Sequence, residues 1–362
     1  MALARRLAAV APLLTLALAG AVWYRTAPAP RPLSRVAARV LGPRELSALR
    51  QAPDPGSSFR APDAIFGAVR VSDLSAVTIA MAPTEDGRYI PQAFRIQWAA
   101  RTKTPLATVN AALRAWARDG VPDPFWPNWS PDGRWLVWPD ARADNLMLVS
   151  VDDGTSRRCR APFSLDGMAI HWLPDSSGWV ALARPEGDAV AYHYMTDRPE
   201  PIRHTPLAGL SGVWRSIGVT SYGILLLAIP RIGADGTPGV RVVQYDLGTG
   251  HPQPRPLGAL SFPGMALQEA ACSPRGDRIA WLFAPREGIR RPGLAARIRL
   301  RLLPASGTVS MSGLWLSAPD GSRLRRLADV EPGDLPRQLA WERDGRRLRF
   351  AYQQALYALT VE

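Results

Sequence analysis

The chain has 362 residues, 47% of them hydrophobic and 21% charged, with a formal net charge of +13. A chain of this length can bury one large core or two small ones. Its two cysteines, Cys159 and Cys272, have no CxxC partner and are too few for a disulfide framework or a thiolate metal site. We therefore interpret both as small buried side chains.

The positive charge is concentrated in two stretches. Residues 1–61 hold nine arginines against two acidic residues, and residues 286–301 hold six arginines against Glu287, so the rest of the chain has a net charge of only +1. A nucleic-acid-binding protein concentrates its charge on a folded face, often with interleaved aromatic residues. The pattern favours a membrane or another anionic envelope surface as partner, and not nucleic acid.

The N-terminus has the order of features of a secretory signal. Arg5 and Arg6 precede an uncharged apolar run, Leu7–Trp23, which offers small-residue cleavage sites near its end. Its 17 residues form a helix at the lower limit for spanning a bilayer. Residues 1–25 are therefore predicted to be a signal peptide or a signal anchor. We expect the protein to be membrane-anchored or secreted, outside the cytoplasm, in a bacterial-type envelope.

Residues 26–61 contain six prolines and several arginines, a composition typical of a semi-rigid tether, with a short helix expected near residues 45–51. From residue 62 to 362, short apolar runs recur between clusters of Pro, Gly, Asp and Ser, the pattern of an all-β domain. Helical spacing interrupts this pattern at Leu106, Val109, Leu113 and Trp116.

The most informative segment is Pro127–Trp138, with the sequence PNWSPDGRWLVW. Pro131 sets φ for the first central position of a turn, Asp132 can bond its own backbone, and Gly133 accepts the left-handed conformation that a hairpin bulge requires. One apolar strand enters this turn and another leaves it. The segment is therefore predicted to be a β-hairpin.

The same unit recurs three times with a less regular sequence, as IHWLPDSSGWVA from Ile170, ACSPRGDRIAW from Ala271 and LAWERDGRRLRF from Leu339. The copies place one set of residues at a common repeat position: Trp129, Trp172, Cys272 and Trp341. Apolar runs that end in polar turns follow three of the units, at residues 146–151, 240–245 and 314–316. Each run is predicted to be a third strand, and four strands per unit make a propeller blade.

A degenerate unit at Trp214 and an opening unit at Met81–Ile90 bring the total to six blades, with five or seven as alternatives. The chain stops one strand after its last hairpin, so the last blade lacks an outer strand. We expect Phe66–Val71 to fill that place and close the ring, because closure removes exposed strand edges.

The sequence Trp129–Arg134 resembles the repeat of TolB-like propellers, which are related to WD-repeat propellers and have six blades. The resemblance covers roughly residues 75–362 and implies the fold more than an activity. It implies a non-catalytic, membrane-tethered scaffold or adaptor that binds a protein or an envelope component. TolB-like propellers also resemble the gating domain of prolyl-oligopeptidase-type peptidases, whose catalytic domain requires a second large stretch of chain.

We find no motif for catalysis, for a cofactor or for a metal. The histidines at 171, 193, 204 and 251 show no zinc-ligand spacing, Ser211 lacks the GxSxG context, and no phosphate-binding loop is present. We therefore predict no catalytic, cofactor-binding or metal-binding residue. The alternative is an envelope hydrolase or lyase with its site in the propeller channel. Acidic and histidine residues converging on the channel favour that alternative, whereas an apolar and arginine lining favours binding.

The sharpest departure from the repeat is a basic hairpin insertion at about residues 286–311. Within it, Arg297–Leu302 alternates strictly, so a strand there has guanidinium groups on one face and aliphatic chains on the other. We predict that this hairpin binds a membrane, a protein or an envelope polymer, and the competing interpretation is a solvated hairpin without a partner. Its candidate binding residues are Arg290, Arg291, Arg297, Arg299 and Arg301.

Overall fold

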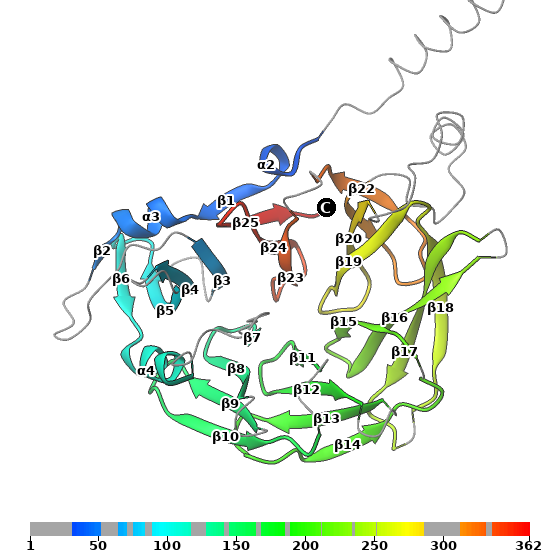
Figure 1. Ribbon diagram of the computed structural model, residues 1–362, viewed down its shortest axis with the longest axis horizontal. Coiled ribbons are helices and arrows are strands. Elements are labelled where there is room, and N and C mark those ends of the chain that lie inside the picture. Colours follow the sequence, from blue (N-terminus) through cyan, green and yellow to red (C-terminus); the bar gives the residue numbers. More distant parts are fainter. Residues whose placement is uncertain are drawn as a thin grey trace, which may run out of the picture.

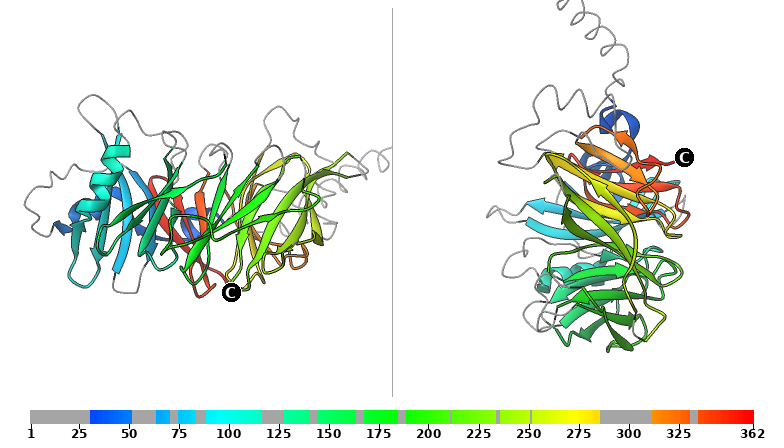
Figure 2. Two further views of the ribbon diagram at one scale, coloured as in Figure 1. Left: turned by 90° about the horizontal axis from the view of Figure 1, so that it is seen from below. Right: turned by 90° about the vertical axis from the view of Figure 1, so that its right-hand side faces the viewer.

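The structure is a ring of six β-sheets around one axis (Figure 1). Seen from the side, the sheets stand next to one another in a single layer (Figure 2). The predicted six-bladed β-propeller is therefore confirmed. The computed structural model describes residues 31–51, 64–70, 75–83, 89–116, 128–140, 145–163, 168–184, 189–210, 212–233, 236–250, 252–285, 312–330 and 335–362.

The blades follow one another in chain order. Within a blade the strands follow in chain order from the axis outward, except that β2 (Arg50–Gln51) and β1 (Ala38–Leu41), from the N-terminal side, lie outermost in blades 1 and 6. Blade 1 holds β3 (Ala64–Arg70), β4 (Ser75–Pro83), β5 (Tyr89–Gln97), β6 (Thr102–Pro105) and β2 (Arg50–Gln51). Blade 2 holds β7 (Asn128–Trp129), β8 (Trp135–Asp140), β9 (Asn145–Ser150) and β10 (Ser156–Arg160). Blade 3 holds β11 (Ala169–Trp172), β12 (Gly178–Ala183), β13 (Val190–Met195) and β14 (Arg203–Pro206).

Blades 4 to 6 complete the ring in the same way. Blade 4 holds β15 (Arg215–Val219), β16 (Ile224–Ile232), β17 (Pro238–Asp246) and β18 (Arg255–Ser261). Blade 5 holds β19 (Met265–Cys272), β20 (Ile279–Pro285), β21 (Gly313–Ser317) and β22 (Arg325–Ala328). Blade 6 holds β23 (Arg337–Trp341), β24 (Arg347–Tyr352), β25 (Ala355–Thr360) and β1 (Ala38–Leu41).

One hairpin turn repeats in five blades, between the first and second strands. In blade 2, Ser130 N–H donates to the Trp135 carbonyl and Gly133 N–H donates to the Ser130 carbonyl, both at 2.9 Å. Gly133 has φ +70°, the left-handed conformation that the sequence predicts. The same pair of bonds is centred, in the other four blades, on Leu173, Thr220, Ser273 and Glu342. The hairpin repeat is therefore the local unit from which the ring is built.

In blade 4 the hairpin lies later in the chain than the sequence suggests. Trp214 precedes β15, and Val219 stands directly before the turn residue Thr220, the place that Trp172 holds before Leu173. The blade exists as predicted, but its repeat position is held by Val219 and not by Trp214. An aromatic residue without the Pro-Asp-Gly turn gives no fixed register.

The ring is closed by residues 31–51, which we call the closing segment. Its strand β1 pairs antiparallel with β25 of blade 6, and its strand β2 pairs parallel with β6 of blade 1. Between these strands lies α3 (Pro43–Ala48), and α2 (Leu33–Val36) precedes β1. Figure 1 shows the segment lying along the outer rim from blade 6 to blade 1.

The position of the closing segment shows that two predictions are wrong. Residues 31–51 of the predicted tether belong to the propeller, whose described part therefore begins at residue 31 and not at residue 62. Phe66–Val71 does not complete the last blade, because residues up to Arg70 belong to β3, the innermost strand of blade 1. A strand from the N-terminal side does close the ring, but it is β1.

The opening unit at Met81–Ile90 is also one strand out of place. It joins β4 to β5, the second and third strands of blade 1, whereas the other copies join first and second strands. The helix predicted at Leu106–Trp116 is present as α4 (Ala107–Trp116), and its Val109 and Leu113 are buried between blades 1 and 2.

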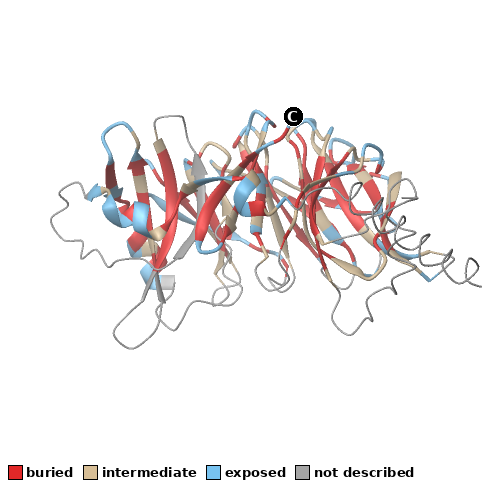
Figure 3. Ribbon diagram, turned by 90° about the horizontal axis from the view of Figure 1, so that it is seen from above, coloured by how far each residue is buried: buried red, intermediate tan, exposed pale blue. Residues whose placement is uncertain are grey.

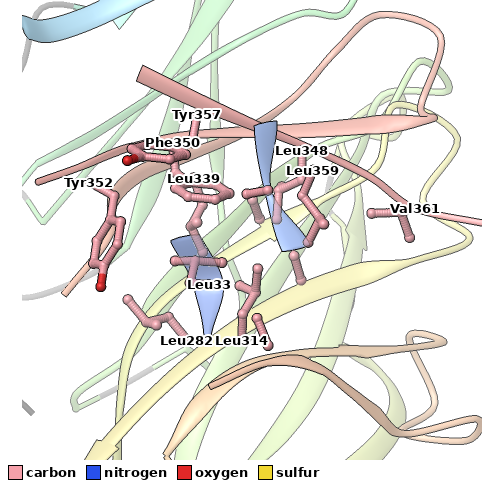
Figure 4. Packing of buried hydrophobic residues seen from close by; sticks show 14 of the residues in the cluster. Leu33, Leu282, Leu314, Leu339, Leu348, Phe350, Tyr352, Tyr357, Leu359 and Val361 are labelled. Atoms are coloured by element: carbon pink, nitrogen blue, oxygen red, sulfur yellow. The ribbon is translucent and has the colours of Figure 1, made fainter. Parts of the chain in front are cut away.

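The core lies between the blades, where neighbouring sheets pack face to face. Figure 3 shows the buried residues along the strands and the exposed ones mainly at the ends and the rim. Between blades 5 and 6 the cluster contains Leu282, Leu314, Leu348 and Phe350, and Leu33 of the closing segment packs against it (Figure 4). The closing segment is therefore anchored in the same core as the blades.

The predicted signal peptide or anchor, residues 1–25, lies outside the described residues. Among the helices that the structure does describe, none combines the length and the apolar character needed to cross a membrane.

Candidate functional site

A cavity of about 1390 Å³ lies on the axis of the ring. Its described lining comes from the innermost strands β7, β11, β15, β19 and β23, together with the second strands of blades 5 and 6. We call this cavity the channel. A concave site lined by several elements is the default place for a ligand in a propeller, because the ring holds its wall in position.

The hairpin turns of neighbouring blades meet at one end of the channel. Ser221 N–H donates to the Pro274 carbonyl at 2.7 Å, and Asp132 N–H donates to Ser176 Oγ at 3.1 Å. The innermost strands therefore all run towards this end. Their first residues lie at the opposite end, which we call the arginine mouth and define by Trp214, Arg215, Gln268, Glu269, Arg337 and Gln338.

Glu269 joins blade 5 to blade 6 at the arginine mouth. Its Oε1 accepts the N–H of Leu339 at 2.7 Å, and its carboxyl also accepts the N–H of Gln338. Burial raises the pKa of Glu269 to about 7, although these two donors and the nearby Arg215 and Arg337 act to lower it. At neutral pH this carboxyl therefore populates both its charged and its neutral form.

Two exposed arginines lie on either side of Glu269, one on each neighbouring blade. Arg215 Nη1 donates to the Gln268 carbonyl at 2.9 Å. The guanidinium of Arg337 has no hydrogen-bond or ion-pair partner within the described part of the chain. A third guanidinium, that of Arg184, lies 4.7 Å from the ring centroid of Trp214. Within the described residues, three guanidinium groups, from blades 3, 4 and 6, therefore lie around Glu269 and Trp214.

Several buried nitrogen atoms of the channel wall have no hydrogen-bond partner among the described residues. They are Nε2 of Gln338, Nε1 of Trp214, Nε1 of Trp129 and Nε2 of His171. Buried polar atoms are normally satisfied, so these four are exceptions in the packing of the wall. The amide and the two indoles can only donate from these nitrogens.

Two tryptophans of the repeat position, Trp172 and Trp341, are structural. Trp172 Nε1–H donates to the Asn128 carbonyl at 3.0 Å, and Trp341 Nε1–H donates to the Ala271 carbonyl at 2.9 Å. Both carbonyls belong to the innermost strand of the preceding blade. The repeated indole thus ties each of these blades to its neighbour, as the periodic placement of tryptophan predicts.

The described wall does not assemble acid–base chemistry. His171 lies on β11 of blade 3 and Glu269 on β19 of blade 5, with blade 4 between them. Burial lowers the pKa of His171 to about 4, so its imidazole is neutral at physiological pH. In the described ranges no three His, Cys, Asp or Glu side chains gather closely enough to hold a metal.

Neither cysteine is reactive. Cys159 is buried, and Cys272 is half-buried in the channel wall, where its Sγ contacts Gly218. Burial raises the pKa of the Cys159 thiol to about 11 and that of Cys272 to about 12. The expectation of a small buried side chain is met fully by Cys159 and in part by Cys272.

The site predicted from the sequence lies outside the described residues: Arg290, Arg291, Arg297, Arg299 and Arg301. The insertion that carries them leaves the described fold at Pro285, the end of β20, which lines the channel beside the start of β19. Sequence reasoning missed the arginine mouth. A signal was present, because Arg215 and Arg337 each stand five residues before the turn residues Thr220 and Glu342.

Neither a family model nor a curated protein sequence matches the chain. Solved structures resemble it at the level of the fold. TolB from Acinetobacter baumannii is 14% identical with a TM-score of 0.45, over 80% of this chain and 65% of that chain. The β-propeller domain of the Trilobed protease from Pyrococcus furiosus is 10% identical with a TM-score of 0.45, over 83% of both chains.

An acylaminoacyl peptidase from Pyrococcus horikoshii is 11% identical with a TM-score of 0.41, over 80% of this chain and 49% of that chain. The chain is a six-bladed β-propeller. This assignment rests on its six sheets and their shared hairpin. The chain spans less than two thirds of TolB and about half of the peptidase. What those proteins do is therefore no guide to what this one does.

Proposed function

We propose that this propeller is a non-catalytic adaptor that binds a segment of a protein partner in its channel. The observation that supports the proposal is a cavity of about 1390 Å³, walled by five described blades, whose lining includes the exposed side chains of Arg215 and Arg337. Apolar side chains interleave with them, among them Leu335, Pro336 and Trp214. Protein ligand sites typically combine an apolar wall with a few polar groups that orient the ligand.

We also propose that the N-terminus holds the propeller at a membrane, on its extracytoplasmic side. The supporting features are the Arg5–Arg6 pair and the apolar run Leu7–Trp23. The first described residue, Arg31, is attached at the rim, since its N–H donates to Asp329 Oδ2 at 2.8 Å just after β22. A tether that joins the ring at its rim leaves both ends of the channel accessible.

Photo-crosslinking tests channel binding. Ala340 is exposed and lines the channel, and Ile202 is 51% exposed on the outer part of blade 3. With p-benzoyl-phenylalanine in place of Ala340, we expect a discrete crosslinked protein species in membranes of the source cell. The same group in place of Ile202 should not give that species. Identical products from both positions, or none from Ala340, contradict the proposal.

The basic insertion is tested separately as a second contact with a membrane or a partner. We expect the triple variant Arg297→Ala, Arg299→Ala and Arg301→Ala to lower recovery of the partner from detergent-solubilised membranes, because it removes three guanidinium groups from the basic insertion. Unchanged recovery removes the insertion from the proposal and leaves channel binding in place.

A further inference from the structure

The backbone of the arginine mouth is irregular. The innermost strands of three successive blades lose register at nearly the same height, between Ser216 and Gly218, between Leu267 and Glu269, and between Arg337 and Ala340. The innermost strand of blade 1, β3, also loses register, between Ile65 and Gly67, whereas β7 and β11 do not. A bulge directs a side chain away from the regular alternation and is common next to binding sites. The mouth is therefore a built feature of blades 4 to 6.

Glu269 forms no close ion pair with the arginines beside it, although their charges act on its pKa. Its carboxyl is occupied by the backbone N–H groups of Leu339 and Gln338, so it serves the joint between blades. Neither Arg215 nor Arg337 forms an ion pair with it within the described residues. Since its pKa lies near 7, it is also only partly charged at neutral pH. Among the described residues of the mouth, the arginine side chains therefore leave positive charge that is available to a ligand.

Gln338 of the arginine mouth has an unusual backbone conformation. It has φ +59°, a left-handed conformation that a non-glycine residue adopts at a cost, and the bonds from Glu269 hold it there. Its side-chain Nε2 and the Nε1 of Trp214 are buried donors without a partner in the described ranges. The exposed guanidinium groups of Arg215 and Arg337 only donate hydrogen bonds, so a ligand complementary to them supplies acceptors and negative charge.

We propose that the arginine mouth is a carboxylate-binding site in which Arg215, Arg337 and Gln338 recognise an acidic peptide segment of the partner. This inference rests on the proposed function, because it names the chemistry of the segment bound in the channel. The apolar residues Leu335, Pro336 and Trp214 at the same mouth favour a peptide over a sugar–phosphate polymer, since they offer surface to side chains between the carboxylates.

The test uses the full-length protein and labelled decapeptides of defined composition in a fluorescence-anisotropy titration. The first peptide alternates Glu and Leu, and the second alternates Gln and Leu. Each is made with a free and with an amidated C-terminus, which separates side-chain carboxylates from a terminal one. We expect the Glu peptide to bind at least about tenfold more tightly than the Gln peptide, because charge-assisted hydrogen bonds are lost in the latter.

The double variant Arg215→Gln and Arg337→Gln should abolish this preference. Its matched control, Arg158→Gln with Arg255→Gln, removes the same charge from exposed residues on the outermost strands β10 and β18 and should leave the preference unchanged. Equal binding of Glu and Gln peptides, or equal loss in both double variants, overturns the proposal. Tighter binding of inorganic polyphosphate than of the Glu peptide overturns the peptide assignment.

The two proposals can fail separately. If crosslinking from Ala340 persists in Arg215→Gln with Arg337→Gln and the peptide preference is absent, channel binding stands and the carboxylate site is wrong. If Ala340 captures no partner, the proposed function fails whatever the peptides do. Because Arg215 and Arg337 are exposed, both variants should fold, which their thermal unfolding curves verify.

Discussion

Two joints of the ring hold a buried ionisable group against backbone, and they do so with opposite chemistry. At the closing joint, between blades 6 and 1, Lys103 of β6 donates to the carbonyls of Leu46 and Ser47 at 2.8 and 3.5 Å. At the joint between blades 5 and 6, Glu269 of β19 accepts N–H groups from the bulge of β23. Lys103 donates to carbonyls at the C-terminal end of helix α3, whereas Glu269 accepts from backbone N–H groups at the bulge in strand β23.

Burial moves both groups towards neutrality. It lowers the pKa of Lys103 to about 8 and raises that of Glu269 to about 7. The difference lies in what surrounds them. Around Glu269, the described core of blades 5 and 6 is a continuous cluster of leucines and aromatic residues. Around Lys103, the described cluster is smaller and holds Leu41 and Leu46 of the closing segment together with Phe94 and Ile96 of blade 1.

The largest effect is expected from Leu46, which is fully buried in α3. Leu46→Ala should lower the free energy of unfolding by about 2–5 kcal/mol, because it leaves a cavity under the closing segment. Urea denaturation measures the loss. Ser47→Ala, which truncates an exposed neighbour, serves as the control. A loss below that of the control shows that the closing segment contributes little to stability.

A smaller effect is expected from Lys103. Lys103→Met keeps the aliphatic stem but removes the donors to α3, so carbonyls at the end of that helix lose a partner at a cost of about 1–3 kcal/mol. The same denaturation experiment measures it. A variant as stable as the unchanged protein shows that the cost of burying the ammonium offsets its hydrogen bonds.

Glu269 should make stability depend on pH. Its folded pKa of about 7 lies above the ordinary value of 4.5, so the stability it contributes is complete below pH 4.5 and is lost as the pH rises to about 7. Glu269→Gln should lack this decline. The difference between the two stability curves cancels the contribution of His171, which is lost in the opposite direction as the pH falls through about 4. A difference that does not vary between pH 4.5 and 7 contradicts the assignment.

The smallest effect is expected from the indole that ties blade 6 to blade 5. Trp341→Phe removes the hydrogen bond to the Ala271 carbonyl and should cost about 1 kcal/mol. Trp172→Phe removes the equivalent bond between blades 3 and 2 and should cost the same. Thermal unfolding of both variants measures this, and a much larger loss at only one position shows that the joints are not equivalent.

The parts of the fold that the sequence could predict are those with short-range causes. The hairpin around Gly133 depends on a few adjacent residues, so its copies indicated the number of blades. The closing segment could not be predicted, because Leu33, Leu41 and Leu46 stand singly among Pro and Arg and form no periodic pattern. Its Pro-rich composition indicated a tether, and only tertiary packing overrides that indication.

The candidate site was missed for a related reason. Arg215, Glu269 and Arg337 come from three blades and lie far apart in the chain, so no local motif joins them. The positive charge that stood out lay in the insertion at residues 286–311, where arginines are adjacent in sequence. Aligning the blades on their turn residues brings Arg215 and Arg337 to one height, which composition alone does not.

Lys103 is the only lysine in the chain, and its side chain is 1% exposed. Its amine is therefore shielded for as long as α3 stays docked on blade 1. An amine-directed acylating reagent can reach that nitrogen only when the closing segment lifts away, and mass spectrometry of a single peptide then reads out the opening. Acylation of Lys103 thus reports whether the closing segment is docked on blade 1.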